Sequence, residues 1–189
     1  MNDRSGLDIK AQVLEWRRAV GLAAAHLSVA RKLHEVKTLD VNKEVWGPFE
    51  AFLELTYHAH RNGLIINLHA ALDTHRSTIK VADLLKRYPE SLASAANREL
   101  SQIDPKVRAG VKQVRDKTAG HRSRSHSNRT AWATAGLTFD LLSEMIVHLE
   151  AVSDLLGAHD GSGPLIMAMG AADQLGEMLL FIIEGAARA

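Results

Sequence analysis

The sequence predicts an all-α protein, folded as an antiparallel bundle of four long helices with short helices between them. Apolar residues recur at the three- and four-residue spacing of a helix, and few stretches alternate with the two-residue period of a strand. The chain has 189 residues, of which 46% are hydrophobic and 24% charged, and its linkers are short. This composition suits one domain with a substantial core. We therefore expect a single helical domain over 1–189, with residues 1–7 disordered.

Two long helices are expected in the first half of the chain. The first covers about 8–38, where Val13 and Trp16 begin an apolar stripe. The second covers about 43–75. Gly63 lies inside it and costs about 1 kcal/mol relative to alanine. A close approach of two helices at Gly63 would offset that cost.

Shorter helices are expected in the middle of the chain, over 79–87, 91–103 and 105–118. Ser77 or Thr78 is the expected cap of the first of them. Asp104 is the expected cap of the third, because it directly precedes a proline at the first helical position.

The remainder of the chain is expected to contain one loop and two long helices. Residues 119–136 are polar and punctuated by glycine, which predicts a loop. Residues 137–158 and 165–187 have helical patterns. The stretch 165–187 is the most apolar, but its three acidic residues favour a core helix over a membrane span. We therefore expect no membrane partner.

Cysteine is absent, which excludes a disulfide framework and a thiolate metal site. The N-terminal residues lack the charged and then apolar pattern of a secretory signal. Both observations favour a cytoplasmic protein.

Positive charge is concentrated in one segment, 105–129. It has eight basic residues and one acid, Asp116, so its charge is +7, whereas the whole chain carries +1 and the remainder therefore carries −6. This asymmetry indicates an anionic partner at the segment. The alternative is an ordinary solvated basic face.

Arg115 and His121 are the residues in this segment with catalytic potential. A histidine with a pKa near 6.5 exchanges protons at neutral pH. An arginine stays charged and binds phosphate oxygens through paired hydrogen bonds. Together they have the chemistry to cleave RNA without a metal: the histidine assists attack by the 2′-hydroxyl, and the arginine stabilises charge on the phosphorane. The alternative is that Arg115 makes a surface ion pair and His121 ends a helix.

The spacing of this pair constrains its geometry. Six positions along a continuous helix leave two side chains about 120° apart. Convergence within one chain therefore requires the helix to end between Thr118 and Gly120, which Gly120 permits. Otherwise two copies of the chain must meet in a symmetric dimer to build one cleft.

These residues resemble a known family. Arg115, Asp116 and His121 fit the arginine–polar–histidine signature of the HEPN superfamily. The middle of the chain resembles the abortive-infection branch of that superfamily. The similar features are a long helix closing with Leu72 and Asp73, a short helix within 77–85, and the motif 114–121.

The resemblance implies a homodimer with the active cleft at its interface. It also implies metal-independent endoribonuclease activity without a cofactor, in a toxin–antitoxin or phage-defence setting with an antitoxin as a further partner. In this hypothesis Arg115 binds the phosphate, His121 transfers the proton and Asp116 orients one of them. The expected RNA-backbone ligands are Lys112, Lys117, Arg122, Arg124 and Arg129.

Two other functions stay open at this point. The first is a non-catalytic HEPN module that binds RNA or a protein. The second is a metal enzyme built on Asp140, Glu144 and His148, which share one helical face. The sequence lacks the Glu-x-x-His pattern of di-iron bundles, the glycine-rich phosphate loop and the Gly-x-Ser-x-Gly elbow. We therefore assign no metal site.

Overall fold

A computed structural model describes residues 9–38, 50–73, 75, 78–117 and 128–163. Within these ranges the chain forms α-helices and no strand, so the predicted all-α class is confirmed. The helices are α1 (Ile9–Thr38), α3 (Glu50–Leu72), α4 (Val81–Leu85), α5 (Glu90–Gln102), α6 (Pro105–Arg115), α7 (Asn128–Ala135) and α8 (Phe139–Asp160).

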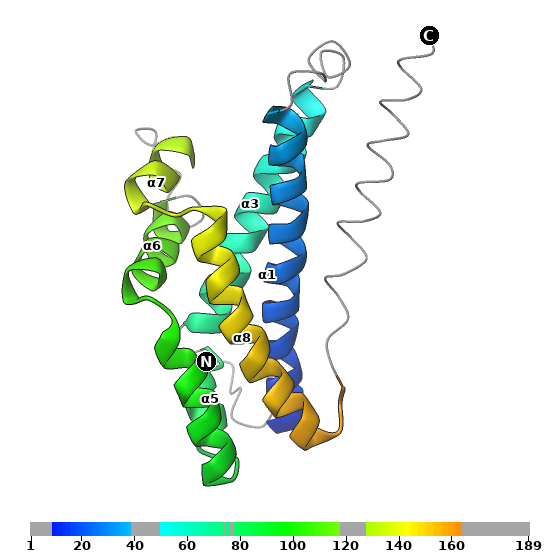
Figure 1. Cartoon of the computed structure of the whole chain (residues 1–189), viewed down its shortest axis with the longest axis vertical. Helices are drawn as coiled ribbons and strands as arrows, with labels where there is room; N and C mark the ends of the chain where they lie inside the picture. The colour runs from blue at the N-terminus through cyan, green and yellow to red at the C-terminus, as the bar shows by residue number, and fades with distance from the viewer. Residues whose placement is uncertain (1–8, 39–49, 74, 76–77, 118–127, 164–189) are drawn as a thin grey trace, which may run out of the picture.

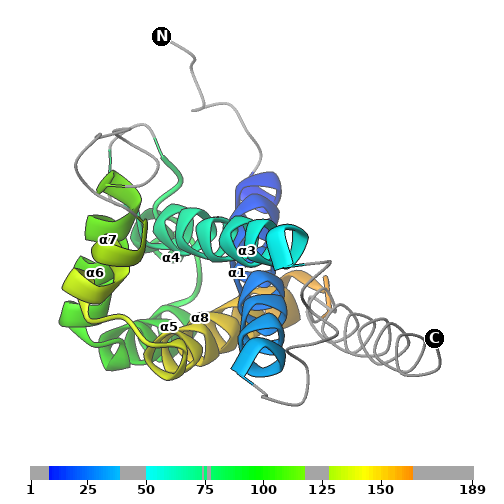
Figure 2. The same cartoon turned by 90° about the horizontal axis from the view of Figure 1, so that it is seen from above.

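The three long helices α1, α3 and α8 form the centre of the arrangement. In Figure 1, α3 and α8 both run opposite to α1. Seen from above in Figure 2, α3 and α8 lie on either side of α1, and α6 and α7 close the far side. Helix α1 packs on α3 and α8, while α6 packs on α3 and α5 on α8. The predicted fourth long helix, 165–187, lies outside the described residues, so the four-helix bundle stays a prediction.

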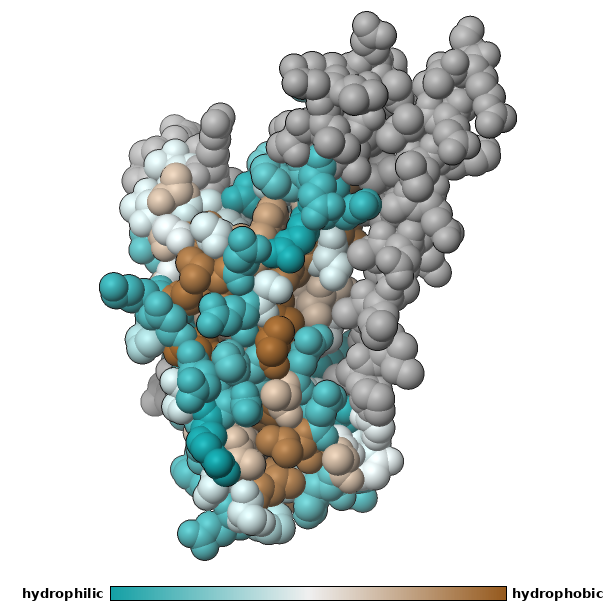
Figure 3. All heavy atoms as spheres, in the orientation of Figure 1, coloured by the Kyte–Doolittle hydropathy of each residue, from teal (hydrophilic) through white to brown (hydrophobic). Residues whose placement is uncertain are grey.

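The core forms where the apolar stripes of the long helices meet. Val13, Trp16 and Val20 of α1 are buried, as are Leu68 of α3 and Leu149 of α8. Full burial of one such aliphatic side chain stabilises the fold by about 1.5–3 kcal/mol. The buried Trp16 indole donates its N–H to the Ala71 carbonyl at 2.9 Å. On the face shown in Figure 3 the surface is mainly hydrophilic with separate apolar patches, as expected for the outside of a folded domain.

Gly63 lies at a close crossing of α1 and α3. A Cβ atom built on it would lie 2.4 Å from His26 Nε2. The His26 ring in turn faces His60, with the two Nδ1 atoms 2.9 Å apart. The His26 side chain of α1 therefore occupies the space that a side chain on Gly63 would need.

Arg17 joins α1 to the end of α8, although it lies in the middle of a helix and is only 1% exposed. Its Nε donates to Ser153 Oγ at 3.1 Å, its Nη1 to Ser162 Oγ at 2.5 Å, and its Nη2 to the Gly163 carbonyl at 2.5 Å. The guanidinium occupies the space beside Gly157 that a side chain at this position would need. A buried charge is tolerated here because each of the three guanidinium nitrogens donates a hydrogen bond.

The predicted loop over 119–136 is wrong in its second half, because 128–135 form α7. The physical reason is tertiary packing: Ala131 and Trp132 are buried, and the Arg61 guanidinium lies 4.0 Å from the Trp132 ring centre. Gly136 follows α7 with a φ of 63°, a left-handed conformation that suits glycine. Residues 119–127 of the predicted loop lie outside the described residues, as do residues 1–7.

Cap predictions had mixed outcomes. Asp104 caps α6 as predicted, accepting a hydrogen bond from the Lys106 amide at 2.7 Å. The prediction that Thr78 caps the next helix is wrong, because α4 begins after Lys80 without a side-chain cap. The Thr78 hydroxyl instead donates to the His75 carbonyl at 2.7 Å. The alternative cap, Ser77, lies outside the described residues.

Candidate functional site

Helix α6 carries the candidate arginine at its last position. Its apolar stripe, Val107, Val111 and Val114, is buried, which turns Lys112 and Arg115 away from the core. Cations at a helix C-terminus interact favourably with the helix dipole. The Arg115 side chain is 43% exposed, so its guanidinium is anchored yet accessible to a ligand.

Asp116 holds the two cations of this helix end together. Arg115 Nη1 donates to Asp116 Oδ1 at 3.0 Å, and Lys112 Nζ donates to Oδ2 at 2.7 Å. Both hydrogen bonds lower the pKa of the Asp116 carboxyl, and the one from Lys112 has the larger effect. Asp116 is therefore a carboxylate that orients the arginine and cancels part of the local positive charge.

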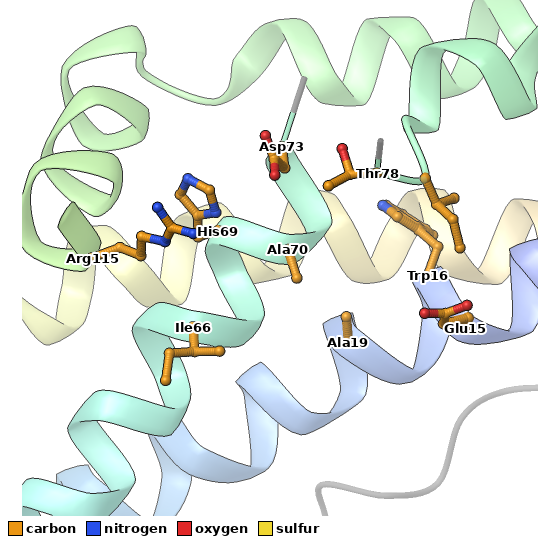
Figure 4. Close-up of a pocket in the computed structure, with 10 residues that line it drawn as sticks. Glu15, Trp16, Ala19, Ile66, His69, Ala70, Asp73, Thr78 and Arg115 are labelled. Carbon is orange, nitrogen blue, oxygen red and sulfur yellow. The ribbon is translucent and has the colours of Figure 1, made fainter. Parts of the chain in front are cut away.

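His69 of α3 lies beside Arg115, because α6 packs across α3. In Figure 4 the His69 ring and the Arg115 guanidinium are adjacent. Burial lowers the pKa of His69, as does the charge of Arg115, while the nearby carboxylates of Asp73 and Asp116 act in the opposite direction. His69 is therefore neutral at neutral pH and available as a proton acceptor.

A pocket of about 250 Å³ opens next to this pair. It lies between α1, α3 and the approach to α4, and it ends at Arg115 (Figure 4). Its lining is Glu15, Trp16, Ala19, Ile66, His69, Ala70, Asp73, Thr78, Ile79 and Arg115. The pocket thus combines an apolar floor with carboxylates and, at one end, a cation beside an imidazole. Such a combination suits a small anionic ligand group with an apolar or planar neighbour.

The other predicted site residues fall in different places. Lys117 lies just after α6, in a π-helical turn that begins at Asp116. His121, Arg122 and Arg124 lie outside the described residues. The meeting of Arg115 and His121 therefore stays a prediction.

Two further basic residues of the segment also have defined positions. Arg129 lies in the first turn of α7, but its side chain lies outside the described part of the chain. Arg108, counted in the +7 segment, donates to the Leu100 carbonyl. The Arg108 guanidinium therefore makes a structural contact, and the positive charge available to a ligand is smaller than the +7 counted from the sequence.

The row Asp140, Glu144 and His148 does not form a metal site in the described part of the chain, where no cluster of three potential ligands is present. Asp140 pairs with Arg31 at 2.5 Å. His148 Nδ1 lies 2.9 Å from Glu99 of α5. Asp140 and His148 therefore contribute contacts between helices.

His69 is the site residue that sequence reasoning missed. Its one local signal was Asp73, one helical turn later, since residues four apart share a face. Nothing in the spacing linked His69 to Arg115, because the two are brought together by the packing of α3 on α6.

Comparisons with protein-family models, curated proteins and solved structures return no match for this chain. No helix among the described residues combines the length and the apolar character needed to cross a membrane. The chemistry of the Arg115 pocket must therefore be inferred from its own residues.

Proposed function

We propose that the protein is a metal-independent endoribonuclease of HEPN type. One observation carries the proposal: Arg115, the arginine of the Arg115–His121 motif, is held by Asp116 at the end of a pocket, with its guanidinium partly exposed. A fixed and accessible guanidinium is suited to bind a phosphate oxygen pair. The all-α fold is compatible with the resemblance, as is the basic segment around the motif.

In the proposed reaction Arg115 binds the non-bridging oxygens of the scissile phosphate and stabilises the charge that builds up on them. His121 transfers a proton, and Asp116 fixes the arginine. Lys112, Lys117 and the arginines at 122, 124 and 129 bind the flanking backbone. The proposed setting is a toxin or phage-defence effector in the cytoplasm, acting as a homodimer with the cleft at its interface and restrained by an antitoxin.

The decisive experiment is cleavage of labelled single-stranded RNA by purified protein in EDTA. Wild-type protein should cut the strand, and Arg115→Ala and His121→Ala should lose at least a hundredfold in rate, as expected for removal of a charge-stabilising or proton-transfer group. Arg98→Ala, which removes an exposed arginine on α5, is the matched control and should cut like the wild type. Equal cleavage by His121→Ala and wild type would refute the proposal.

A second candidate function is a non-catalytic module that binds RNA or a protein partner. It is favoured by exposed apolar side chains on α3, where Phe52 is 61% and Leu55 is 71% exposed. Contiguous exposed apolar residues often mark a protein contact. This function predicts RNA binding that weakens with salt and leaves the strand intact. The same EDTA assay separates the two candidates, because only the ribonuclease yields shorter strands.

A further inference from the structure

We propose that the Arg115 pocket binds a guanosine nucleotide, with the phosphate on Arg115 and His69 and the base on the Asp73 carboxylate. The inference deepens the proposed ribonuclease and rests on it for the source of this nucleotide, which is the RNA strand. It adds to the cleavage chemistry a site that recognises a base. The expected specificity is therefore for guanosine beside the phosphate that Arg115 holds.

The hollow exists because two small side chains line it. Ala19 of α1 and Ala70 of α3 lie in the wall of the pocket, with Trp16 and Ile66 on the same two helices. Alanine at these positions leaves space that a longer side chain would fill, and the pocket measures about 250 Å³. Pockets for drug-sized ligands measure about 300–1,000 Å³, so this one has room for a single ring system. Its apolar lining suits the flat face of such a ring.

The cationic end of the pocket suits a phosphate. The Arg115 side chain is 43% exposed, and among the described residues only Asp116 accepts a hydrogen bond from it, through Nη1. Its Nε and Nη2 are therefore left to bind two phosphate oxygens in parallel. The His69 ring lies beside the guanidinium in Figure 4, and a neutral imidazole has one N–H to donate to a further oxygen.

Asp73 supplies the acceptor for the base. It follows His69 by four positions, so the two side chains lie on one face of the chain, about 6 Å apart along the helix axis. In the view of Figure 4, Asp73 lies between the Arg115 end and the Trp16 end of the pocket. Its Oδ1 accepts the His75 amide at 2.9 Å, which orients the carboxylate. A nucleotide whose phosphate binds Arg115 therefore brings its base to Asp73.

Guanine is the base whose donors match a carboxylate. An ionised carboxylate accepts hydrogen bonds and donates none. Guanine presents N1–H and N2–H side by side on one edge, so both can donate to the carboxylate. Adenine and cytosine place an acceptor nitrogen next to the amino group, and uracil places a carbonyl on each side of its N–H. Glu15 also lines the pocket, so negative charge disfavours a phosphate there and fixes the orientation of the nucleotide.

Binding is tested by calorimetric titration of the full chain with 5′-GMP, 5′-UMP and ribose 5-phosphate. GMP should bind at least about tenfold more tightly than the other two, as expected for hydrogen bonds to a charged group. Asp73→Asn should abolish this preference without weakening ribose 5-phosphate, whereas Arg115→Ala should weaken all three ligands. Asp154→Asn, which removes an exposed carboxylate on α8, is the matched control and should bind like the wild type.

A second pair of variants tests the hollow itself. Ala70→Leu puts a larger side chain into the pocket at an exposed position, so the fold should be retained while GMP binding is lost. Ala59→Leu is its control, because Ala59 is exposed about three turns earlier on the same helix. Thermal unfolding followed by circular dichroism verifies that both variants are folded.

RNA cleavage separates this inference from the proposed function. Wild-type protein should cut beside guanosine in a strand that is otherwise uridine, and Asp73→Asn should lose that preference through a higher KM. Equal binding of the three ligands, or a GMP preference that survives Asp73→Asn, would overturn the guanosine site even if RNA is cut. Selective GMP binding without RNA cleavage would overturn the ribonuclease and RNA as the source, while the nucleotide site would stand.

Discussion

Replacing Gly157 by alanine should destabilise the protein, although the same change usually strengthens a helix by about 0.8–1.0 kcal/mol. The added Cβ would lie 2.4 Å from Arg17 Nη2 and 2.5 Å from Cζ, well inside the ordinary contact distance of about 3.5–4.0 Å. The guanidinium must therefore shift by about 1 Å. It is held by Ser153, Ser162 and the Gly163 carbonyl, so such a shift breaks or lengthens at least one of these hydrogen bonds.

The expected loss combines two costs. Breaking at least one charged hydrogen bond costs about 1.5–3 kcal/mol, and overpacking adds about 1–3 kcal/mol. After subtracting the helix-propensity gain, the free energy of unfolding should fall by about 2–5 kcal/mol. For a domain of this size that lowers Tm by about 4–20 °C. Thermal and urea unfolding, followed by circular dichroism at 222 nm, measure both quantities.

A double-mutant cycle identifies the cause. Arg17→Met removes the atoms that the new Cβ would meet, so in that background Gly157→Ala should be neutral or stabilising by up to about 1 kcal/mol. A rise in Tm on adding Gly157→Ala to the wild type would refute the reasoning, because it would mean that the guanidinium gives way without cost.

Two further predictions concern the stability of the bundle. The pKa values of His26 and His60 are lowered, chiefly by burial, so below about pH 6.5 the unfolded chain binds more protons than the folded one. The stability that these two neutral histidines contribute should therefore be fully present above pH 6.5 and be lost as the pH falls through their folded pKa values. His60→Gln should make Tm vary less between pH 7.5 and pH 5. An unchanged slope of Tm against pH would contradict the assignment. The Thr138 hydroxyl accepts the Leu141 amide at the start of α8, so Thr138→Ala should cost about 1 kcal/mol in urea unfolding. The exposed Thr134, whose hydroxyl only donates to its own helix, is the control and should change stability by less than about 0.5 kcal/mol when replaced by alanine.

The positions of the long helices were accessible from sequence because they depend on periodicity. The α1 stripe through Val13, Trp16 and Val20 has a helical period, and the structure buries it. The prediction failed where tertiary contacts decide the outcome. Helix α7 is short and follows a serine- and glycine-containing stretch, so its sequence resembles a loop. Packing of Trp132 against Arg61 and Phe139 provides the contacts that local sequence cannot supply.

The candidate site was predictable only in part, for the same reason. The sequence singled out Arg115 and Asp116 because they are neighbours in a basic segment. It could not identify His69, whose role depends on α3 crossing α6. Nor could the sequence distinguish Arg108, which donates to the Leu100 carbonyl, from basic side chains that are accessible to a ligand. From the sequence alone, Arg17 would likewise be expected to be a solvated helix residue. Its burial is explained only by hydrogen-bond acceptors at the end of α8, such as Ser153.

The pairing of α1 with α8 also sets an order for folding on the ribosome. Phe139 follows Thr38 by 101 positions, so at about 5–20 residues per second α1 waits roughly 5–20 s for this partner. Until then α3 covers one side of α1, and Arg17 remains hydrated because Ser153 and Ser162 have not been synthesised. Docking of α8 then moves that cation from water into the interior. Until the end of α8 is synthesised, the side of α1 that α8 covers in the finished fold stays uncovered by it.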